Sequence, residues 1–321
     1  MLKTVFGELP TWARKSNPLL RYQLKRQGDD ARPKVSTIIM WVLGLSVILV
    51  ASVFYNTNGL QRPLQIPYSV EIWQILLYPL LSIQLVMRIA GVSMGVGAVS
   101  DERQRQTWDN LRATERGAEL GVRSRWVAVF YRLRGLLLTV TIGRIILLGA
   151  LLYEATSAQG AIIDLWTASA LPSVSMQVGI LVVSAFMTAF LVLPFTGLGI
   201  DIALGLWIST SVRNRAFAAI LQLLVVLFRI GTTLGFFWLA WRFTNEELEL
   251  SNELALFVLG ANAVLGDLGL MLSQLQTSAQ QWAFVPNSLF LGLVMLLIII
   301  LQGAFVSAIL TRAGRTAETR E

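Results

Sequence analysis

Residues 174 to 212 read VSMQVGILVVSAFMTAFLVLPFTGLGIDIALGLWISTSV, and this 39-residue stretch decides the fold class because it contains a single charged residue. As one helix it would be about 58 Å long, whereas a hydrocarbon core of about 30 Å needs about 20 apolar residues. Two crossings would place Arg213 and Arg215 outside, against the preference of basic residues for the cytoplasmic side. We therefore expect one helix, from about Val178 to Ser209, bent near Pro194.

The rest of the 321-residue chain agrees with this reading. It is 55% hydrophobic and only 14% charged, with a mean hydropathy of +0.64, far from the balance of a soluble domain. The first 36 residues are polar and basic, and no cleavage motif follows the first apolar run, so we expect no signal peptide. We predict an all-α integral membrane protein with six transmembrane helices. The other five spans are Thr37 to Tyr55, Ile72 to Val99, Gly135 to Tyr153, Ala216 to Trp241 and Ser288 to Leu310.

The distribution of charge predicts the topology. Of the 26 basic residues, 21 lie in four segments that would share the cytoplasmic side, whereas the opposite segments hold two arginines and eight acids. Both termini are then cytoplasmic, as in a bacterial inner membrane protein. One membrane domain, 37–310, lies between an N-terminal segment, 1–36, and a tail, 311–321. Within the outer segment 242–286, the glycine-broken run 254–272 is expected to be interfacial or re-entrant.

Several classes of function are excluded by composition. The chain has no cysteine and no histidine, so thiolate nucleophiles, Cys/His metal sites and imidazole catalysis are absent. All four lysines lie in the first 34 residues, so no Walker-A lysine follows and we expect no ATPase activity of its own. We expect no bound metal or cofactor. The net charge of +7 follows the topology and is not taken as a sign of nucleic-acid binding.

The N-terminal segment contains a candidate interfacial helix. Leu20 and Leu24 share one helical face, while Arg21 and Lys25 are positioned for lipid headgroups. We predict that this helix lies on membrane lipids of the inner leaflet. It would be either a simple anchor or a mechanical link to a partner protein.

Four ionisable residues fall inside the predicted spans and must be explained, because each costs a few kcal/mol on insertion scales. Counting the helix rise from the expected span ends places Arg144 and Asp201 at the same depth, so we predict that they form an ion pair. Arg229 would face the same carboxylate or a cavity for an anionic headgroup, and Arg88 would extend to the inner membrane surface. Structural cross-linking and a substrate pathway are both possible roles for the Arg144, Asp201 and Arg229 group.

Glycines recur in two of these spans. At such positions two helices can approach closely, and we favour packing within one chain over a dimer contact. These glycines are Gly91, Gly95, Gly97, Gly197, Gly199 and Gly205.

The predicted cytoplasmic connection 100–134 combines charges of both signs with large apolar residues. Trp108 and Leu111 are three residues apart, so one helical turn can present both, flanked by Arg105 and Arg112. Such a face fits a pocket on a cytosolic protein. It also fits packing against the inner ends of the chain's own helices.

Two short motifs resemble those of ABC-2 type transporter permeases. The run Asp101-Glu-Arg-Gln-Arg-Gln-Thr-Trp-Asp-Asn-Leu111 is similar to the E-x-x-x-G-T-x-x-x-L signature of that family, with Glu102, Thr107 and Leu111 at the matching positions. Residues 17–24, NPLLRYQL, resemble the N-P-[VL]-L-x-x-E-L opening, and six spans with a re-entrant region before the last one match the layout.

The resemblance implies a function that composition does not give. Two permease subunits, of the same or a homologous chain, would form the substrate pathway of an exporter. Separate cytosolic ATPase subunits would bind ATP and Mg²⁺ and move the segment that contains Glu102, Thr107, Trp108, Leu111 and Arg112. Two alternatives remain at this point: a non-transporting scaffold subunit of a larger complex, and an intramembrane enzyme acting on lipid, for which the chain has few chemical tools.

Overall fold

The computed structural model describes most of the predicted membrane domain. The predicted first span, 37–55, and four of the predicted coupling residues, Thr107, Trp108, Leu111 and Arg112, lie outside the described residues. The described residues are 10–14, 16–26, 68–104, 117–157, 167–168, 170, 174–212, 214–244, 247–265, 285 and 287–319.

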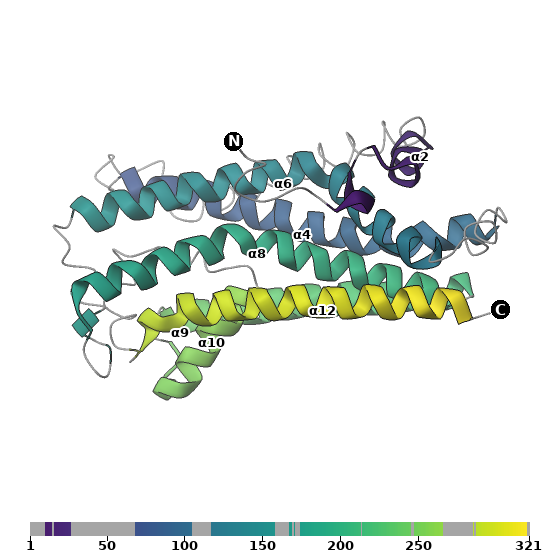
Figure 1. Cartoon of the computed structure of the whole chain (residues 1–321). Helices are drawn as coiled ribbons and strands as arrows, with labels where there is room; N and C mark the ends of the chain where they lie inside the picture. The colour runs from purple at the N-terminus through teal and green to yellow at the C-terminus, as the bar shows by residue number, and fades with distance from the viewer. Residues whose placement is uncertain are drawn as a thin grey trace.

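All regular secondary structure in these ranges is helical, as predicted (Figure 1). A short 3-10 turn, η1 (Thr11–Ala13), precedes the N-terminal helix, and another, η3 (Ser288–Phe290), precedes the last helix. The α-helices are α2 (Pro18–Arg26), α4 (Tyr68–Gln104), α6 (Gly117–Ser157), α8 (Met176–Ser211), α9 (Arg215–Thr244), α10 (Asn252–Leu265) and α12 (Leu291–Thr319).

Four of these helices are long and apolar enough to cross a membrane, which is the arrangement of a multi-pass membrane protein. The third predicted span, Gly135 to Tyr153, lies within α6. The count of six spans, and the side of the membrane on which the termini lie, remain predictions. The four candidate crossings are Pro79–Val99, Met176–Ser211, Arg215–Leu239 and Leu291–Glu318.

The stretch quoted at the outset forms one helix, as predicted, with Pro194 inside it. This helix, α8, lies at the centre of the bundle, where α4, α6 and α12 all pack against it (Figure 1). Its buried residues are spread from Gly179 to Thr210, and most of them lie after Ala189, where the neighbouring helices pack most closely against it. A central helix without a polar face is what an apolar run of this length should give.

Glycines allow α4 and α8 to approach closely, as predicted. A Cβ atom on Gly205 would lie 2.5 Å from the Val92 carbonyl oxygen, and one on Gly95 would lie 2.8 Å from the Ile202 carbonyl oxygen. Such distances are too short for any larger residue without a shift of the backbone. Gly97 differs, because a Cβ atom there would meet nothing within 4 Å. The packing is therefore within one chain at Gly95 and Gly205 but does not involve Gly97.

The helix α6 begins well before the predicted third span. Residues 117–134, predicted as part of a cytoplasmic connection, form its first half and pack against α8 and α12. The indole Nε1 of Trp126 donates a 3.0 Å hydrogen bond to the Gly199 carbonyl, which aligns this half of α6 with the second half of α8. A Cβ atom on Gly314 of α12 would lie 3.2 Å from Cα of Glu119, so α12 also approaches the first half of α6 closely.

The short helix α10 lies at the opposite end of the bundle from the C-terminus (Figure 1). Its 14 described residues span about 21 Å, and the residues that follow Leu265 lie outside the described ranges. It buries Ala255, Val258 and Leu259 against neighbouring helices and exposes Leu254 and Phe257. Whether it re-enters the bilayer or lies on its surface stays a prediction.

Candidate functional site

A cluster of three charges joins three helices inside the bundle. The carboxylate oxygen Oδ2 of Asp201 on α8 lies 3.7 Å from Nε of Arg88 on α4 and 3.5 Å from Nη2 of Arg229 on α9. The Arg88 and Asp201 side chains are 3% and 4% exposed, and that of Arg229 is 14% exposed. We call these three residues the charge cluster. One carboxylate thus serves two guanidinium groups, and the cluster has a net charge of +1.

The helices place the cluster far from their ends. Arg88 lies 11 residues before the end of its apolar segment at Val99, a rise of about 16 Å. Asp201 lies about 15 Å before Ser211, and Arg229 about 21 Å after Arg215. Because each residue lies well inside an apolar helix, the charges meet at a depth where burying any one alone would be costly.

Gly197 provides the space that Arg88 occupies. A Cβ atom on Gly197 would overlap Nη2 of Arg88 and would lie 2.9 Å from Cζ. The guanidinium therefore lies directly against the backbone of α8, one turn before Asp201. The predicted extension of Arg88 to the inner membrane surface is wrong, because this gap lets the side chain turn inward to a carboxylate.

The predicted ion pair between Arg144 and Asp201 is also wrong. The Arg144 guanidinium donates to the Phe190 carbonyl and lies 4.6 Å from the centre of the Phe190 ring. Phe190 precedes Asp201 by 11 residues on α8, about 16 Å along the axis. The predicted depth was wrong because it assumed that the apolar runs of α6 and α8 begin in one plane. The bond from Trp126 to Gly199 places Gly135 about 14 Å beyond the Gly199 level.

Arg144 instead fills a gap in the hydrogen bonding of α8. Pro194 has no N–H, so the carbonyl four residues earlier, that of Phe190, receives no helical hydrogen bond from it. Arg144 supplies the missing donor and is itself 1% exposed. The residue singled out as a possible pathway group thus has a structural partner that depends on the proline.

Further polar side chains lie near the cluster, and the sequence reasoning missed them. Gln84, one turn before Arg88 on α4, is 2% exposed, and neither of its amide atoms has a hydrogen-bond partner in the described part of the chain. Gln222 of α9 donates a 2.9 Å hydrogen bond to Ser93 of α4. A glutamine in an apolar span is the signal that could have found both, since membrane helices use such groups for contacts or pathways.

The N-terminal helix α2 packs against α6. Leu20 is fully buried in a cluster with Val127 and Ala128, and Leu24 packs at its edge. The Arg132 guanidinium of α6 donates a 3.1 Å hydrogen bond to the Gln23 carbonyl. Burial lowers the pKa of this guanidinium, because desolvation penalises the charged form.

This packing corrects one part of the prediction for the interfacial helix. Leu20 faces protein and not lipid, because α6 presents small residues that accept it. Arg21 and Tyr22 are exposed and remain candidates for the membrane surface. Lys25 lies in the last turn of α2, and Glu102 in the last turn of α4, and only their backbones are described.

The charged residues offer no evident metal site: the described ranges contain no group of three or more His, Cys, Asp or Glu residues able to hold an ion. Comparisons with family models, curated proteins and solved structures found no match. What the chain does must therefore be argued from its own residues.

Proposed function

We propose that this chain is the membrane-spanning permease subunit of an ATP-driven transporter of the ABC-2 type, an exporter of a bacterial inner membrane. The observation that carries the proposal is the charge cluster, in which three helices each contribute one ionisable residue. Ionisable groups at this depth are rare and commonly mark pathways or coupling elements. Because α4, α8 and α9 meet at these charges, a relative movement of the helices must separate or rearrange them.

Coupling to an ATPase is supported by the course of the chain between α4 and α6. The segment that resembles the family signature joins Gln104, the end of α4, to Gly117, the start of α6. Arg88 lies on the same continuous helix, about 24 Å from Gln104. A protein that binds Trp108 and Leu111 and displaces them would thus act on the helix that holds the cluster.

A second permease subunit is supported by the surface of α9. Only 6% of the most apolar part of α9 is buried, compared with 50% of the corresponding part of α4. Gly231 and Gly235 lie four residues apart, and a Cβ atom at either would meet nothing within 4 Å. The G-x-x-x-G spacing in an apolar helix allows a second helix to approach closely. We propose that two copies, or two homologous chains, meet along this face.

Co-purification tests the ATPase partner. The protein is extracted from its native membrane in mild detergent, and the accompanying proteins are identified, for the original chain and for a Trp108→Asp, Leu111→Asp variant. The proposal expects an ATPase that is lost from the variant and kept by the control Leu254→Asp, which adds a charge to an exposed leucine on α10. Recovery with other membrane proteins and no ATPase would instead support the scaffold alternative.

The α9 face is tested by disulfide cross-linking, which needs no prior removal of residues because the chain has no cysteine. A Gly235→Cys variant should form dimers on oxidation in membranes. The control Leu138→Cys lies on α6 at a position that is 61% exposed. Equal cross-linking of both variants would indicate random collisions between chains and would count against the α9 contact.

A further inference from the structure

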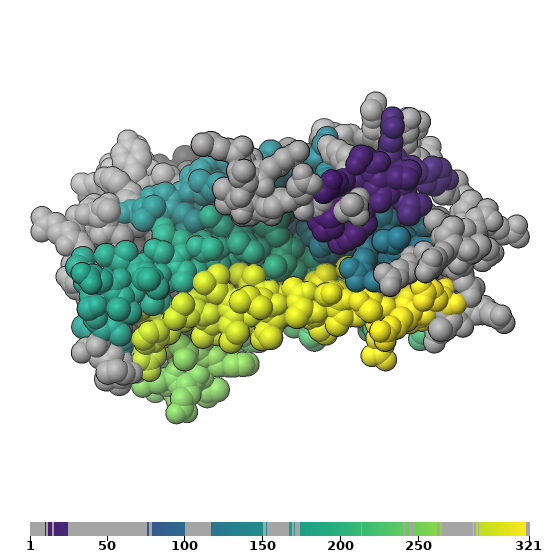
Figure 2. Space-filling view, viewed as in Figure 1, coloured from purple at the N-terminus to yellow at the C-terminus, as the bar shows by residue number. Residues whose placement is uncertain are grey.

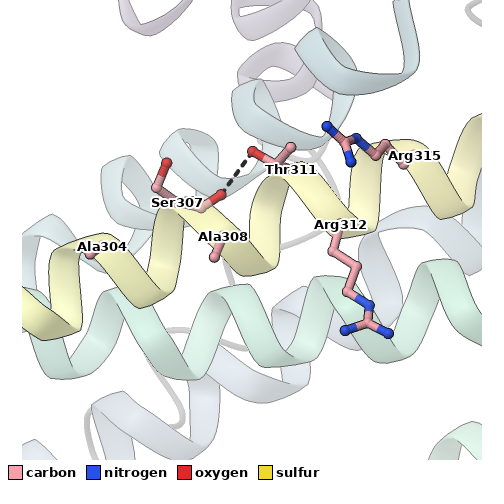
Figure 3. Close-up of a pocket in the computed structure, with 6 residues that line it drawn as sticks. All are labelled: Ala304, Ser307, Ala308, Thr311, Arg312 and Arg315. Atoms are coloured by element: carbon pink, nitrogen blue, oxygen red, sulfur yellow. Dashed lines mark hydrogen bonds between the residues drawn. The ribbon is translucent and has the colours of Figure 1, made fainter.

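A groove lies along the last helix, near its C-terminal end (Figure 3). It has a volume of about 760 Å³. Ala304 and Ala308 contribute small side chains to it, and α12 lies along one face of the molecule, drawn in yellow in Figure 2. The described residues that line it are Ala304, Ser307, Ala308, Thr311, Arg312 and Arg315.

The groove crosses the boundary between apolar and charged surface on α12. From Leu291 to Thr311 the helix contains no charged residue, and Arg312 is the first. The apolar half of the groove, at Ala304 and Ala308, falls within the predicted span and would adjoin the hydrocarbon core. With the predicted end of the span at Leu310, the polar half would lie at headgroup level, on the side that the charge distribution predicts to be cytoplasmic.

The polar half has an excess of positive charge. Arg312 and Arg315 project to different sides of the helix and flank the groove (Figure 3). Arg123 of α6 reaches the groove at Thr311, with Nη2 3.5 Å from Oγ1 of Thr311 and 2.9 Å from a Glu119 oxygen. Glu318 follows one turn beyond Arg315, so among the described residues three arginines and two carboxylates give this end of the helix a charge of +1.

We propose that this groove binds one anionic phospholipid of the cytoplasmic leaflet. A guanidinium binds a phosphate with two parallel hydrogen bonds, and an arginine on each side of the groove can engage the headgroup from either direction. The Ser307 hydroxyl lies nearer the glycerol backbone, and an acyl chain follows Ala304 and Ala308. A basic groove that continues into an apolar one fits a lipid better than it fits a soluble anion, which has no use for the apolar half. The inference does not depend on the proposed transport function.

The test measures lipid retention by the full-length protein. The protein is reconstituted in nanodiscs of phosphatidylcholine with one-fifth phosphatidylglycerol and then released into mild detergent. Native mass spectrometry identifies the lipids that stay bound from the mass that they add. The original chain should retain one phosphatidylglycerol in preference to phosphatidylcholine. An Arg312→Gln, Arg315→Gln variant should lose about 25-fold in this preference, because each basic residue near an anionic surface contributes about fivefold.

Two further variants separate a built groove from general attraction to a basic surface. Arg134→Gln, Arg215→Gln removes the same charge from exposed arginines outside the groove and should leave the preference unchanged. Ala308→Phe fills the groove without changing charge, at an exposed site where folding should not suffer, and should weaken retention. Equal losses in the two double variants, or full retention in Ala308→Phe, would overturn the proposal. So would a partner protein that occupies the groove in the purified complex in place of lipid.

Discussion

Two sites in this bundle bury arginine side chains within apolar helices, and they offset the cost of burying that charge in different ways. Arg144 hydrogen-bonds to a backbone carbonyl that Pro194 leaves without its helical donor, and it lies over the Phe190 ring. Arg88 and Arg229 share the carboxylate of Asp201. The first arrangement depends on a fixed break in one helix, whereas the second depends on three helices staying together. An arginine within a span is therefore not by itself a sign of a pathway. The group that it binds indicates whether its role is structural or part of a pathway.

The largest effect is expected from removing the shared carboxylate. Asp201→Asn would leave two guanidinium groups buried with no negative charge between them, and breaking a buried pair in this way costs about 3–5 kcal/mol. We expect a large fall in thermal stability in detergent. Asp201→Asn with Arg229→Gln should recover much of the loss, since one buried cation is relieved. Stability of Asp201→Asn equal to that of the exposed control Glu253→Gln would contradict the role of the cluster.

The Arg144 site is tested by a double-mutant cycle with its proline. Arg144→Met should cost about 1–3 kcal/mol by leaving the Phe190 carbonyl without a donor. In a Pro194→Ala background, the new backbone N–H can bond to that carbonyl, so the same change should cost less. The free energy of unfolding of all four chains gives the coupling. Additive effects would mean that Arg144 does not compensate for the proline.

Gly197 links the two sites, because it lies between Phe190 and Asp201 and makes room for Arg88. Gly197→Ala should displace the Arg88 guanidinium and destabilise the protein by about 1–3 kcal/mol. Gly97→Ala is the matched control, since an added Cβ atom there meets nothing within 4 Å. It should be neutral or slightly stabilising in a helix. If the thermal midpoints of the two variants change equally, the close contact at Gly197 does not contribute to the stability of the protein.

The smallest effect is expected at the hydrogen bond from Gln222 to Ser93. Hydrogen bonds between membrane helices contribute about 0.6 kcal/mol on average, so Ser93→Ala should shift the thermal midpoint only slightly. A shift as large as that of Asp201→Asn would show that the contact between α4 and α9 depends on this bond more than on the charges.

The sequence predicted the main elements because they follow from composition. Residues 176 to 211 form one helix, as we predicted for this stretch from the positions of Arg213 and Arg215. The four ionisable residues were found because charge in an apolar run is conspicuous.

Their partners could not be predicted, because partners depend on how far one helix is shifted along another. The bond from Trp126 to Gly199 sets that shift, and no local pattern near either residue reveals it. The Arg144 site had one usable signal: a proline within a helix frees the carbonyl four residues earlier. No signal in the sequence could have revealed the space for Arg88 at Gly197, because that space depends on the approach of α4 to α8.

The central claim is that the charge cluster belongs to the transport machinery and is more than structural cross-linking. The most direct measurement uses the complex purified with its ATPase and compares the original chain with Asp201→Asn, Arg229→Gln. A cysteine introduced at Ser93, where α4 contacts Gln222 of α9, reports by its rate of maleimide labelling whether ATP changes the contact between the helices that hold Arg88 and Arg229. We predict an ATP-dependent labelling rate in the original chain that is lost in the variant, while the ATPase stays bound. An equal ATP response in both would contradict the claim and leave the cluster a structural element.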